Sequence, residues 1–233
     1  CQDEPAYEQP LSQQNTLADA IAISRLQSID RGGFPASNLG TSVAIDGDRA
    51  AVGARQDDTA GAVYVLEYRG NTWVRTARLS TPSGASAEDF GYALELDGDR
   101  LIVGAPSNDD KSNDAGAAYI YEFEQGGWRL KAKLVPNLVW PAVYNYRFGT
   151  NVDIEDDIAL VSAPQAQQPS SLSVHVFERQ ASGRWEEATR LEAEGEAYDG
   201  FGSSMELEGN IAMIGAPSAT INQLAKAGAV HVF

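Results

Sequence analysis

FGYALELDGDRLIVGAP, at residues 90–106, is the stretch that decides the fold of this chain. Leu94, Leu96 and Ile102 alternate with polar or smaller residues, which is the period-two pattern of a strand with two different faces. Asp97 and Gly98 form a tight-turn pair, because glycine adopts a positive φ without steric cost. The stretch therefore predicts a strand, a two-residue turn, a second strand and a stop made of small residues.

The same pattern occurs four times along the chain. The leading glycines, which are separated by 51, 58 and 53 residues, are Gly40, Gly91, Gly149 and Gly202. The small residues that end the pattern repeat with the same spacings and are Gly53, Gly104, Ser162 and Gly215. Two landmarks that move together indicate a structural unit, and a period of this length is typical of propeller blades and other repeat arrays.

Each unit also contains material for two further strands. A third strand is expected at residues 62–65, 117–121, 173–177 and 229–233. A fourth begins at a tryptophan in three units, at Trp73, Trp128 and Trp185. Four antiparallel strands are the content of one propeller blade, so the sequence predicts an all-β protein, a β-propeller of four-stranded antiparallel blades.

These units resemble the FG-GAP repeat, which occurs in integrin α-subunit propellers and in many bacterial surface proteins. The second and fourth units carry the full signature, Phe-Gly at 90–91 and 201–202 with Gly-Ala-Pro at 104–106 and 215–217. The third has Ser162 in place of the glycine, and the first departs at both ends, with Leu39 and Arg55. The resemblance covers roughly residues 20–233 and implies a β-propeller, but little about the ligand, because propellers host many functions.

The chain divides into a polar N-terminal tether, residues 1–19, and a propeller domain, residues 20–233. Arg25-Leu26 aligns with Arg78-Leu79, Lys133-Leu134 and Arg190-Leu191, so residues 20–26 are expected to form a strand of the fourth type. Such a strand would complete the last blade and close a ring of four blades. The alternative is an incomplete arc of a larger propeller, since integrin-type propellers usually have seven blades.

Composition restricts the partners. The net charge is −16, from 33 acidic and 17 basic residues. This charge argues against nucleic acid as a partner, because nucleic-acid binding requires a basic surface. The single cysteine, Cys1, precedes a polar run and resembles the lipidated N-terminus of a mature bacterial lipoprotein. The expected location is therefore the bacterial cell envelope, with a lipid anchor on Cys1 and the signal peptide removed; a stray residue is the alternative.

One loop has the oxygen-rich composition of a weak Ca²⁺ site. FG-GAP proteins often bind calcium in loops that follow the Gly-Ala-Pro position. The candidate ligands in the second unit are Asn108, Asp109, Asp110, Asn113 and Asp114. Calcium takes six to eight oxygens, and Lys111 lies in the middle of the loop, so a solvated acidic turn is the alternative. No cofactor is otherwise required.

The longest insertion precedes the third unit and contains aromatic residues that do not recur elsewhere. Its candidate ligand-binding residues are Trp140, Tyr144, Tyr146 and Arg147. Aromatic side chains and arginine dominate binding hot spots, so this loop is expected to stack on a sugar or on a side chain of a partner. The alternative is that the loop folds over a blade and buries its own aromatic residues.

The remaining candidates have structural interpretations. His175 and His231 occupy the strand position of Tyr64 and Tyr119, so both are expected to pack within blades. The recurring tryptophans are scaffold for the same reason, and the acids that precede Phe-Gly, such as Asp89 and Asp199, are expected to cap turns. No nucleophile elbow, HExxH, P-loop or Cys-x-x-Cys motif is present.

These features favour a non-enzymatic binding or adhesion module of the cell envelope that presents propeller loops to a protein or glycan. The alternatives are a scaffold subunit of an envelope complex, which an exposed apolar patch would indicate, and a hydrolase with an acidic loop site.

Overall fold

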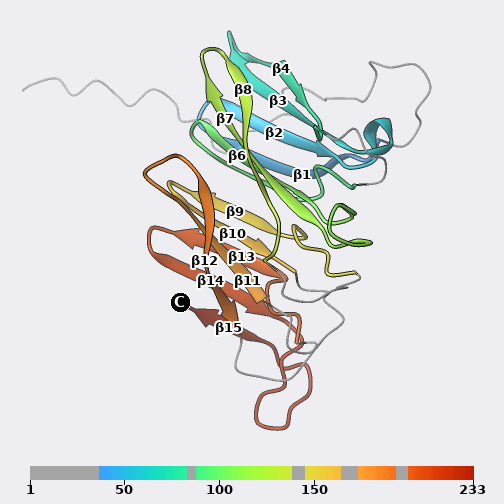
Figure 1. Ribbon diagram of the computed structural model, residues 1–233, viewed down its shortest axis with the longest axis vertical. Coiled ribbons are helices and arrows are strands. Elements are labelled where there is room, and N and C mark those ends of the chain that lie inside the picture. The colour runs from blue at the N-terminus through green and yellow to red at the C-terminus, as the bar shows by residue number, and fades with distance from the viewer. Residues whose placement is uncertain (1–36, 83–87, 138–144, 164–172, 193–198) are drawn as a thin grey trace, which may run out of the picture.

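The strands fall into four antiparallel sheets, which we call blades 1 to 4 (Figure 1). The structure is a computed structural model that describes residues 37–82, 88–137, 145–163, 173–192 and 199–233. Blade 1 contains β1 (Leu39–Asp46), β2 (Arg49–Ala54), β3 (Ala62–Arg69) and β4 (Thr72–Leu79), with a short 3₁₀ helix, η2 (Asp57–Thr59), between β2 and β3. Blade 2 contains β5 (Leu94–Asp97), β6 (Arg100–Ala105), β7 (Ala117–Glu124) and β8 (Gly127–Leu134). Blade 3 contains β9 (Val152–Glu155), β10 (Ile158–Ser162), β11 (Ser173–Arg179) and β12 (Trp185–Glu192). Blade 4 contains β13 (Ser204–Glu208), β14 (Ile211–Ala216) and β15 (Ala229–Val232).

Each blade is a meander in which neighbouring strands pair in chain order. The predicted turns join the first two strands: Asp46 pairs with Arg49, and Asp97 pairs with Arg100. The predicted tryptophans begin or lie near the start of the fourth strands, where Trp73 packs on Tyr68 and Trp128 on Phe123. The all-β fold with its propeller blades is therefore confirmed.

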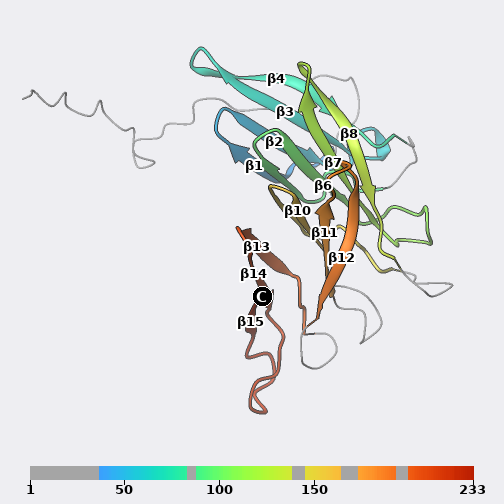
Figure 2. The same cartoon turned by 60° about the vertical axis from the view of Figure 1, so that its left-hand side comes forward.

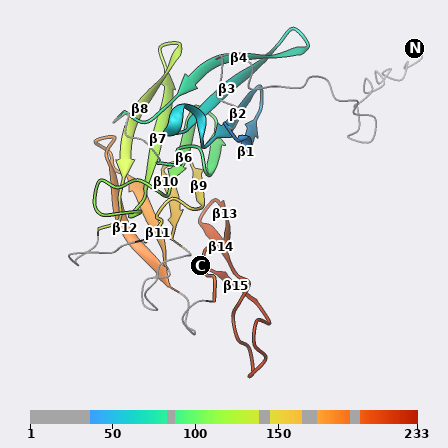
Figure 3. The ribbon, with the colours of Figure 1, turned by 90° about the vertical axis from the view of Figure 1, so that its right-hand side faces the viewer.

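The blades follow one another around a common axis, as Figures 2 and 3 show from two sides. Their first strands are innermost: β1 packs on β5, β5 on β9, and β9 on β13. Residues from the starts of all four first strands, such as Ser42 and Ser204, line one cavity of about 370 Å³. The repeat pattern of the sequence therefore corresponds to a four-bladed arrangement in space.

Apolar side chains fill the spaces between neighbouring blades. Val63 and Val65 of blade 1, for example, belong to one cluster with Leu94 and Leu101 of blade 2. Similar clusters join blade 2 to blade 3 and blade 3 to blade 4. The phenylalanines of the Phe-Gly pairs, Phe90, Phe148 and Phe201, are completely buried. The hydrophobic core is thus a series of interfaces between blades rather than a single centre.

The glycines of the repeat motif allow two blades to approach closely. A Cβ placed on Gly104 would lie 2.0 Å from the carbonyl oxygen of Gly149 in the next blade. A Cβ on Gly53 would lie 2.2 Å from the corresponding oxygen of Gly91. The two glycines of successive motifs are therefore in backbone contact, which explains why they recur together.

A second set of contacts joins the tight turns of successive blades. The first residue of each turn accepts a hydrogen bond from a backbone N–H in the next turn: Asp46 from Gly98 (2.7 Å), Asp97 from Asp156 (2.7 Å) and Glu155 from Gly209. We call these bonds the turn latches. They recur at all three junctions between consecutive blades.

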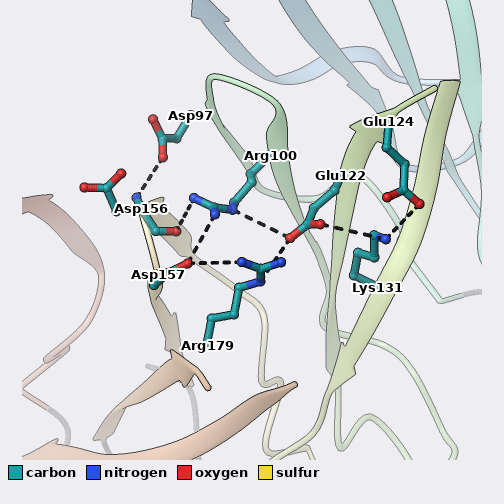
Figure 4. Close-up of polar contacts among 8 residues, drawn as sticks. All are labelled: Asp97, Arg100, Glu122, Glu124, Lys131, Asp156, Asp157 and Arg179. Atoms are coloured by element: carbon teal, nitrogen blue, oxygen red, sulfur yellow. Dashed lines mark hydrogen bonds and ion pairs between the residues drawn. The ribbon is translucent and has the colours of Figure 1, made fainter. Parts of the chain in front are cut away.

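Charged side chains reinforce the junction between blades 2 and 3 (Figure 4). Glu122 of β7 forms ion pairs with Arg179 of β11 at 3.3 Å and with Arg100 at 3.7 Å. Arg100 also reaches Asp157 at 3.1 Å. Between blades 1 and 2 the equivalent arginine, Arg49, pairs with Asp99 and stacks on Phe123 at 4.2 Å. The arginine that begins the second strand therefore links successive blades at both junctions. Arg100 does so through ion pairs, and Arg49 through an ion pair and stacking on an aromatic ring.

Among the described residues, blades 1 and 4 each have an exposed apolar face at the end of the blade series. Val43 and Ile45 of β1 are 69% and 65% exposed. On blade 4 the face turned away from blade 3 carries Ile211, Met213, Val230 and Val232. Between β13 and β1 there is no packing of the extent seen between other first strands. The strand predicted at residues 20–26, together with the tether and Cys1, lies outside the described residues.

Candidate functional site

The loops that follow the second strands form one end of the propeller, which we call the loop face. Between blades 1 and 2 this face contains a cleft of about 470 Å³. Its lining residues are Arg55, Gln56, Thr59, Asp89, Ser107, Asp109, Asn113 and Asp114. Asp89 lies 3.8 Å from Arg55 and accepts a hydrogen bond from the Ser107 hydroxyl at 3.0 Å. The cleft is thus polar and contains more acidic than basic side chains.

The residues predicted to hold calcium lie in this loop but largely bind donors of the protein itself. Lys133 of β8 donates to Asn108 at 3.2 Å and to Asp110. Asp109 accepts the backbone N–H of Asp114 at 2.8 Å. Across the described ranges, no group of three acidic, histidine or cysteine side chains is placed to hold a metal ion. A weak Ca²⁺ site here remains a prediction from the sequence.

The structure joins the acidic loop to the end of the aromatic insertion. The backbone N–H of Asn145 donates to the carbonyl of Asn113 at 3.0 Å, and that of Arg147 donates to Asp114 at 2.9 Å. Two regions singled out independently in the sequence therefore lie side by side on the loop face. Trp140 and Tyr144 lie outside the described residues.

Tyr146 corrects the expectation of an aromatic ligand-stacking group. It is 1% exposed, and its hydroxyl bonds to His175 at 2.8 Å and to Ser173 at 3.1 Å. The reason is that its ring packs edge-on to His175, at 5.9 Å between centroids. For this residue the alternative interpretation is right: the insertion buries its own aromatic side chain.

His175 is the centre of a buried polar network in blade 3. Its Nδ1 lies 2.8 Å from Glu187, which also accepts from Arg190 at 2.7 Å. Burial lowers the pKa of His175 despite the opposing effect of Glu187, so the ring is neutral, donates to Glu187 and accepts from Tyr146. Burial would raise the pKa of Glu187, but hydrogen bonds from His175 and Arg190 outweigh it and lower the pKa to about 2. A serine, a histidine and a glutamate meet here, yet Ser173 and His175 are buried, so a substrate has no access to them in this structure.

The same strand position organises a polar contact in blades 1 and 2. Tyr64 donates to Asp57 at 2.5 Å, and Arg78 of β4 binds the same carboxylate at 3.0 Å. Tyr119 donates to the buried carboxylate of Glu88 at 3.1 Å. The predicted packing role of His175 is therefore confirmed, and His231 likewise packs on Phe201 at 5.3 Å.

These repeated contacts agree with the comparison to known protein families. The family model described as FG-GAP repeat matches residues 34–66, 73–121 and 185–233, which is more than half of the chain. The chain belongs to the FG-GAP repeat family. A search of curated proteins found no match. An FG-GAP propeller fits a binding or adhesion module in general terms.

The part of this FG-GAP protein between the matched segments, residues 122–184, contains most of blade 3. Its departure from the motif is Ser162, which is buried and whose hydroxyl accepts the backbone N–H of Asn151 at 3.3 Å. Ser162 Cβ lies 2.9 Å from where Gly202 would carry a Cβ, so the glycine of the next blade still provides the space. The blade is therefore retained despite the substitution.

Two functional features of the FG-GAP propeller were missed by sequence reasoning. The first is the cation that precedes leucine in the fourth strand. Arg78 and Lys133 bind the loop-face acids Asp57 and Asp110, whereas Arg190 binds Glu187 of its own strand. The recurrence of this cation before leucine was the available signal. The second is a group of carboxylates on the inner strands, Glu95, Asp153 and Glu206. Burial, followed by repulsion from Glu95 and Glu206, raises the pKa of Asp153 to about 7, although the Leu207 N–H donates to it at 2.7 Å. No local pattern distinguishes these acids from exposed strand residues.

The predicted capping role of the acid before Phe-Gly is confirmed in the fourth unit. Asp199 is buried, and its Oδ1 accepts the backbone N–H of Phe201 at 2.9 Å. In the second unit, Glu88 aligns with Asp199, and Asp89 aligns with Gly200. Asp89 faces the cleft, where it meets Ser107 and Arg55. Asp89 therefore belongs to the candidate site as well as to the scaffold.

Proposed function

We propose that this protein is a non-enzymatic binding module whose loop-face cleft between blades 1 and 2 receives a basic segment of a protein partner. FG-GAP repeats commonly mediate binding of protein ligands, which supports the class of partner. The net charge of −16 supports attraction of a cationic ligand. A glycan ligand of the insertion loop, an envelope scaffold and a hydrolase with an acidic loop site are competing proposals.

The observation that carries the proposal is the composition of the cleft. Asp89, Asp109 and Asp114 line it against a single arginine, Arg55. Asp109 is exposed, and one of its two carboxylate oxygens accepts the Asp114 N–H. Carboxylates on a rigid scaffold bind lysine and arginine side chains through charge-assisted hydrogen bonds.

The test compares two peptides that differ only in charge: one rich in lysine, and the same sequence with glutamine at those positions. Fluorescence anisotropy at physiological ionic strength, where long-range attraction is screened, should detect binding of the lysine peptide alone. Asp109→Asn together with Asp114→Asn should weaken binding by about tenfold or more, which corresponds to about 1.4 kcal/mol. No binding of the lysine peptide would contradict the proposal.

A matched control separates the cleft from general charge. Asp48→Asn with Glu186→Gln removes the same two charges at exposed positions outside the cleft. We expect this variant to bind within about twofold of the wild type, since exposed, distant charges are screened. Equal losses in both double variants would mean that the net charge, and not the cleft, attracts the peptide.

Placement in the bacterial envelope through a lipid on Cys1 is part of the same proposal and is supported by the sequence pattern. Among the residues that the structure describes, no helix has the length and apolar character to cross a membrane. Labelling of cells with a radioactive fatty acid should mark the full-length protein and not the Cys1→Ser variant. Equal labelling of both would reject Cys1 as the lipid attachment site.

A further inference from the structure

A second groove lies at the opposite end of the strands from the loop face, and we call it the turn-side groove. It has a volume of about 990 Å³ and lies between the outer hairpins of blades 1 and 2, β3–β4 and β7–β8. Residues of the β1–β2 and β5–β6 turns complete its lining. This volume is at the upper end of the ~300–1,000 Å³ that is usual for ligand sites. The groove shares no lining residue with the loop-face cleft.

The groove is open because a phenylalanine takes the place of a bridging arginine. Phe123 and Arg179 occupy the same position in successive blades, since each pairs with the tryptophan of its fourth strand. At the junction of blades 2 and 3, Arg179 forms an ion pair with Glu122 at 3.3 Å (Figure 4). Glu67 is the equivalent of Glu122, because both lie opposite the arginine that begins the second strand. Phe123 carries no charge and cannot bind Glu67 in this way.

The walls of the groove combine apolar surface with polar groups that the protein holds in place. Trp128 of β8 is half-buried, and Val74 of β4 is 40% exposed. Arg49 lies over the Phe123 ring at 4.2 Å and pairs with Asp99. A guanidinium and a carboxylate are therefore fixed beside the apolar surface, and such a combination is typical of small-molecule sites.

The charges of the groove favour a neutral ligand. Four acidic residues and three arginines line it, so its charge is nearly balanced, although the chain as a whole carries −16. Arg49 pairs with Asp99, and Arg69 pairs with Glu67. These pairs supply hydrogen-bond donors and acceptors without an excess of one charge that would attract an ion.

The edge of β4 disfavours an extended peptide as the ligand. A peptide that adds to a sheet needs a regular ladder of backbone groups at the edge strand. In the β3–β4 ladder the register shifts between Val65 and Leu66, which leaves Thr76 as an extra residue in β4. Bulges of this kind protect edges from the addition of a strand. A ligand that binds through hydroxyl groups needs no such ladder.

We propose that the turn-side groove binds a neutral oligosaccharide. The C–H groups on one face of a pyranose ring pack on Trp128 and Val74. Arg49 and Arg69 donate hydrogen bonds to its hydroxyl groups, and Asp99 accepts hydrogen bonds from them. The site is separate from the loop-face cleft, so it does not depend on the partner proposed for that cleft.

An array of immobilised neutral, sialylated and sulfated oligosaccharides tests the class of ligand. We expect the wild-type protein to retain neutral members, and calorimetry then measures the affinity for the one retained best. Arg69→Gln with Asp99→Asn should weaken this binding by about tenfold or more, through lost hydrogen bonds. The net charge does not change, and both side chains are more than 60% exposed, so the variant should fold.

A matched control removes an ion pair of the same kind outside the groove. Arg184 and Glu186 form an exposed pair at 3.7 Å in blade 3. Arg184→Gln with Glu186→Gln also leaves the net charge unchanged. We expect this variant to bind the neutral oligosaccharide within about twofold of the wild type, since an exposed pair contributes little to the fold.

Phe123→Arg closes the groove by restoring the bridging arginine. The new side chain can pair with Glu67 as Arg179 pairs with Glu122, so binding of the neutral oligosaccharide should fall by more than about tenfold. Cooperative urea denaturation shows that the variant is folded. Gln180→Arg adds the same charge at an exposed position of blade 3 and should bind as the wild type does.

Three results would overturn the proposal. Retention of sialylated or sulfated oligosaccharides alone would show that the ligand is an anion. Binding of a neutral oligosaccharide that is unchanged in Phe123→Arg and in the double variant would place the glycan site elsewhere. Retention of no oligosaccharide would reject this class of ligand, and a peptide selected from a random library that binds the wild type but not Phe123→Arg would identify a peptide site instead.

Discussion

At the scale of single residues, the motif glycines and the acidic residues of the inner strands affect the stability of the fold for different physical reasons. Gly104 is required because the Gly149 carbonyl of the next blade occupies the space of a side chain. Asp153, by contrast, is a charged group in a poor environment: it is 8% exposed and near two other carboxylates, so its pKa rises to about 7. The first residue type stabilises the fold by being small, and the second makes its stability depend on pH.

Gly104→Ala should destabilise the protein by about 1–3 kcal/mol or more, because the added methyl group forces two blade backbones apart. Gly127→Ala is the matched control: a Cβ there meets no atom within 4 Å, and the residue does not have a positive φ. Urea denaturation should show a lower midpoint for the first variant and a nearly unchanged one for the second. Similar midpoints for the two variants would contradict the close glycine contact.

Asp153→Asn should remove a pH dependence of stability. The pKa of Asp153 is raised from 3.8 to about 7 in the folded protein, so its stabilising effect is complete below pH 4 and is lost as the pH rises to about 7. The asparagine can still accept the Leu207 N–H but carries no charge. We expect the variant to match the wild type near pH 4 and to be more stable by about 1–3 kcal/mol at pH 8.

Thermal unfolding of the two proteins at a series of pH values measures this difference. Glu186→Gln, an exposed charge removal, should not change the pH dependence. A constant difference between Asp153→Asn and the wild type from pH 4 to pH 8 would show that Asp153 ionises normally in the folded protein.

At the scale of the elements, charged side chains decide how firmly neighbouring blades are held. Glu122 of β7 lies among three cations: Arg179 at 3.3 Å, Arg100 at 3.7 Å and Lys131 at 3.9 Å (Figure 4). Its side chain is 14% exposed, whereas that of the neighbouring Glu124 is 45% exposed and bonds to Lys131 alone. Only the first carboxylate therefore joins blade 2 to blade 3.

Glu122→Gln should lower the free energy of unfolding by about 1–3 kcal/mol, because it leaves Arg100 and Arg179 close together with only the exposed Asp157 as a shared carboxylate. Glu124→Gln should cost less than about 0.5 kcal/mol, as is usual for an exposed pair. Urea denaturation at low and high salt checks both values. Equal effects of the two substitutions would mean that the network at the blade junction adds nothing beyond an ordinary surface pair.

At the scale of the whole molecule, the turn latches indicate whether blade 4 meets blade 1. Three latches join the consecutive blades, and Glu208 and the Gly47 N–H are the parts of a fourth. Both residues are exposed in the described structure. The sequence-based prediction that blade 4 is completed and the ring closes implies that these two residues bond to each other.

Glu208→Ala should therefore destabilise the full-length protein about as much as Glu155→Ala, which removes a latch present in the structure. The expected loss is about 1 kcal/mol for each bond, the usual net contribution of one hydrogen bond. In a variant without residues 1–36, Glu208→Ala should have no further effect, while Glu155→Ala should still destabilise. Thermal unfolding of the four proteins measures this difference, and a neutral Glu208→Ala in the full-length protein would argue against closure.

The sequence by itself determined the strands, the turns, the four repeats and hence the propeller. These follow from local chemistry: period-two alternation, Asp-Gly turns and small residues at fixed spacing. It also predicted the packing of His175 and the cap of Asp199, since both occupy repeated positions. Only the tertiary structure decided that Tyr146 is buried, that Lys133 occupies the acidic loop and that Asp153 lies near Glu95 and Glu206. Those outcomes depend on which side chains of different blades face each other, and residues about 50 positions apart carry no local signal of that meeting.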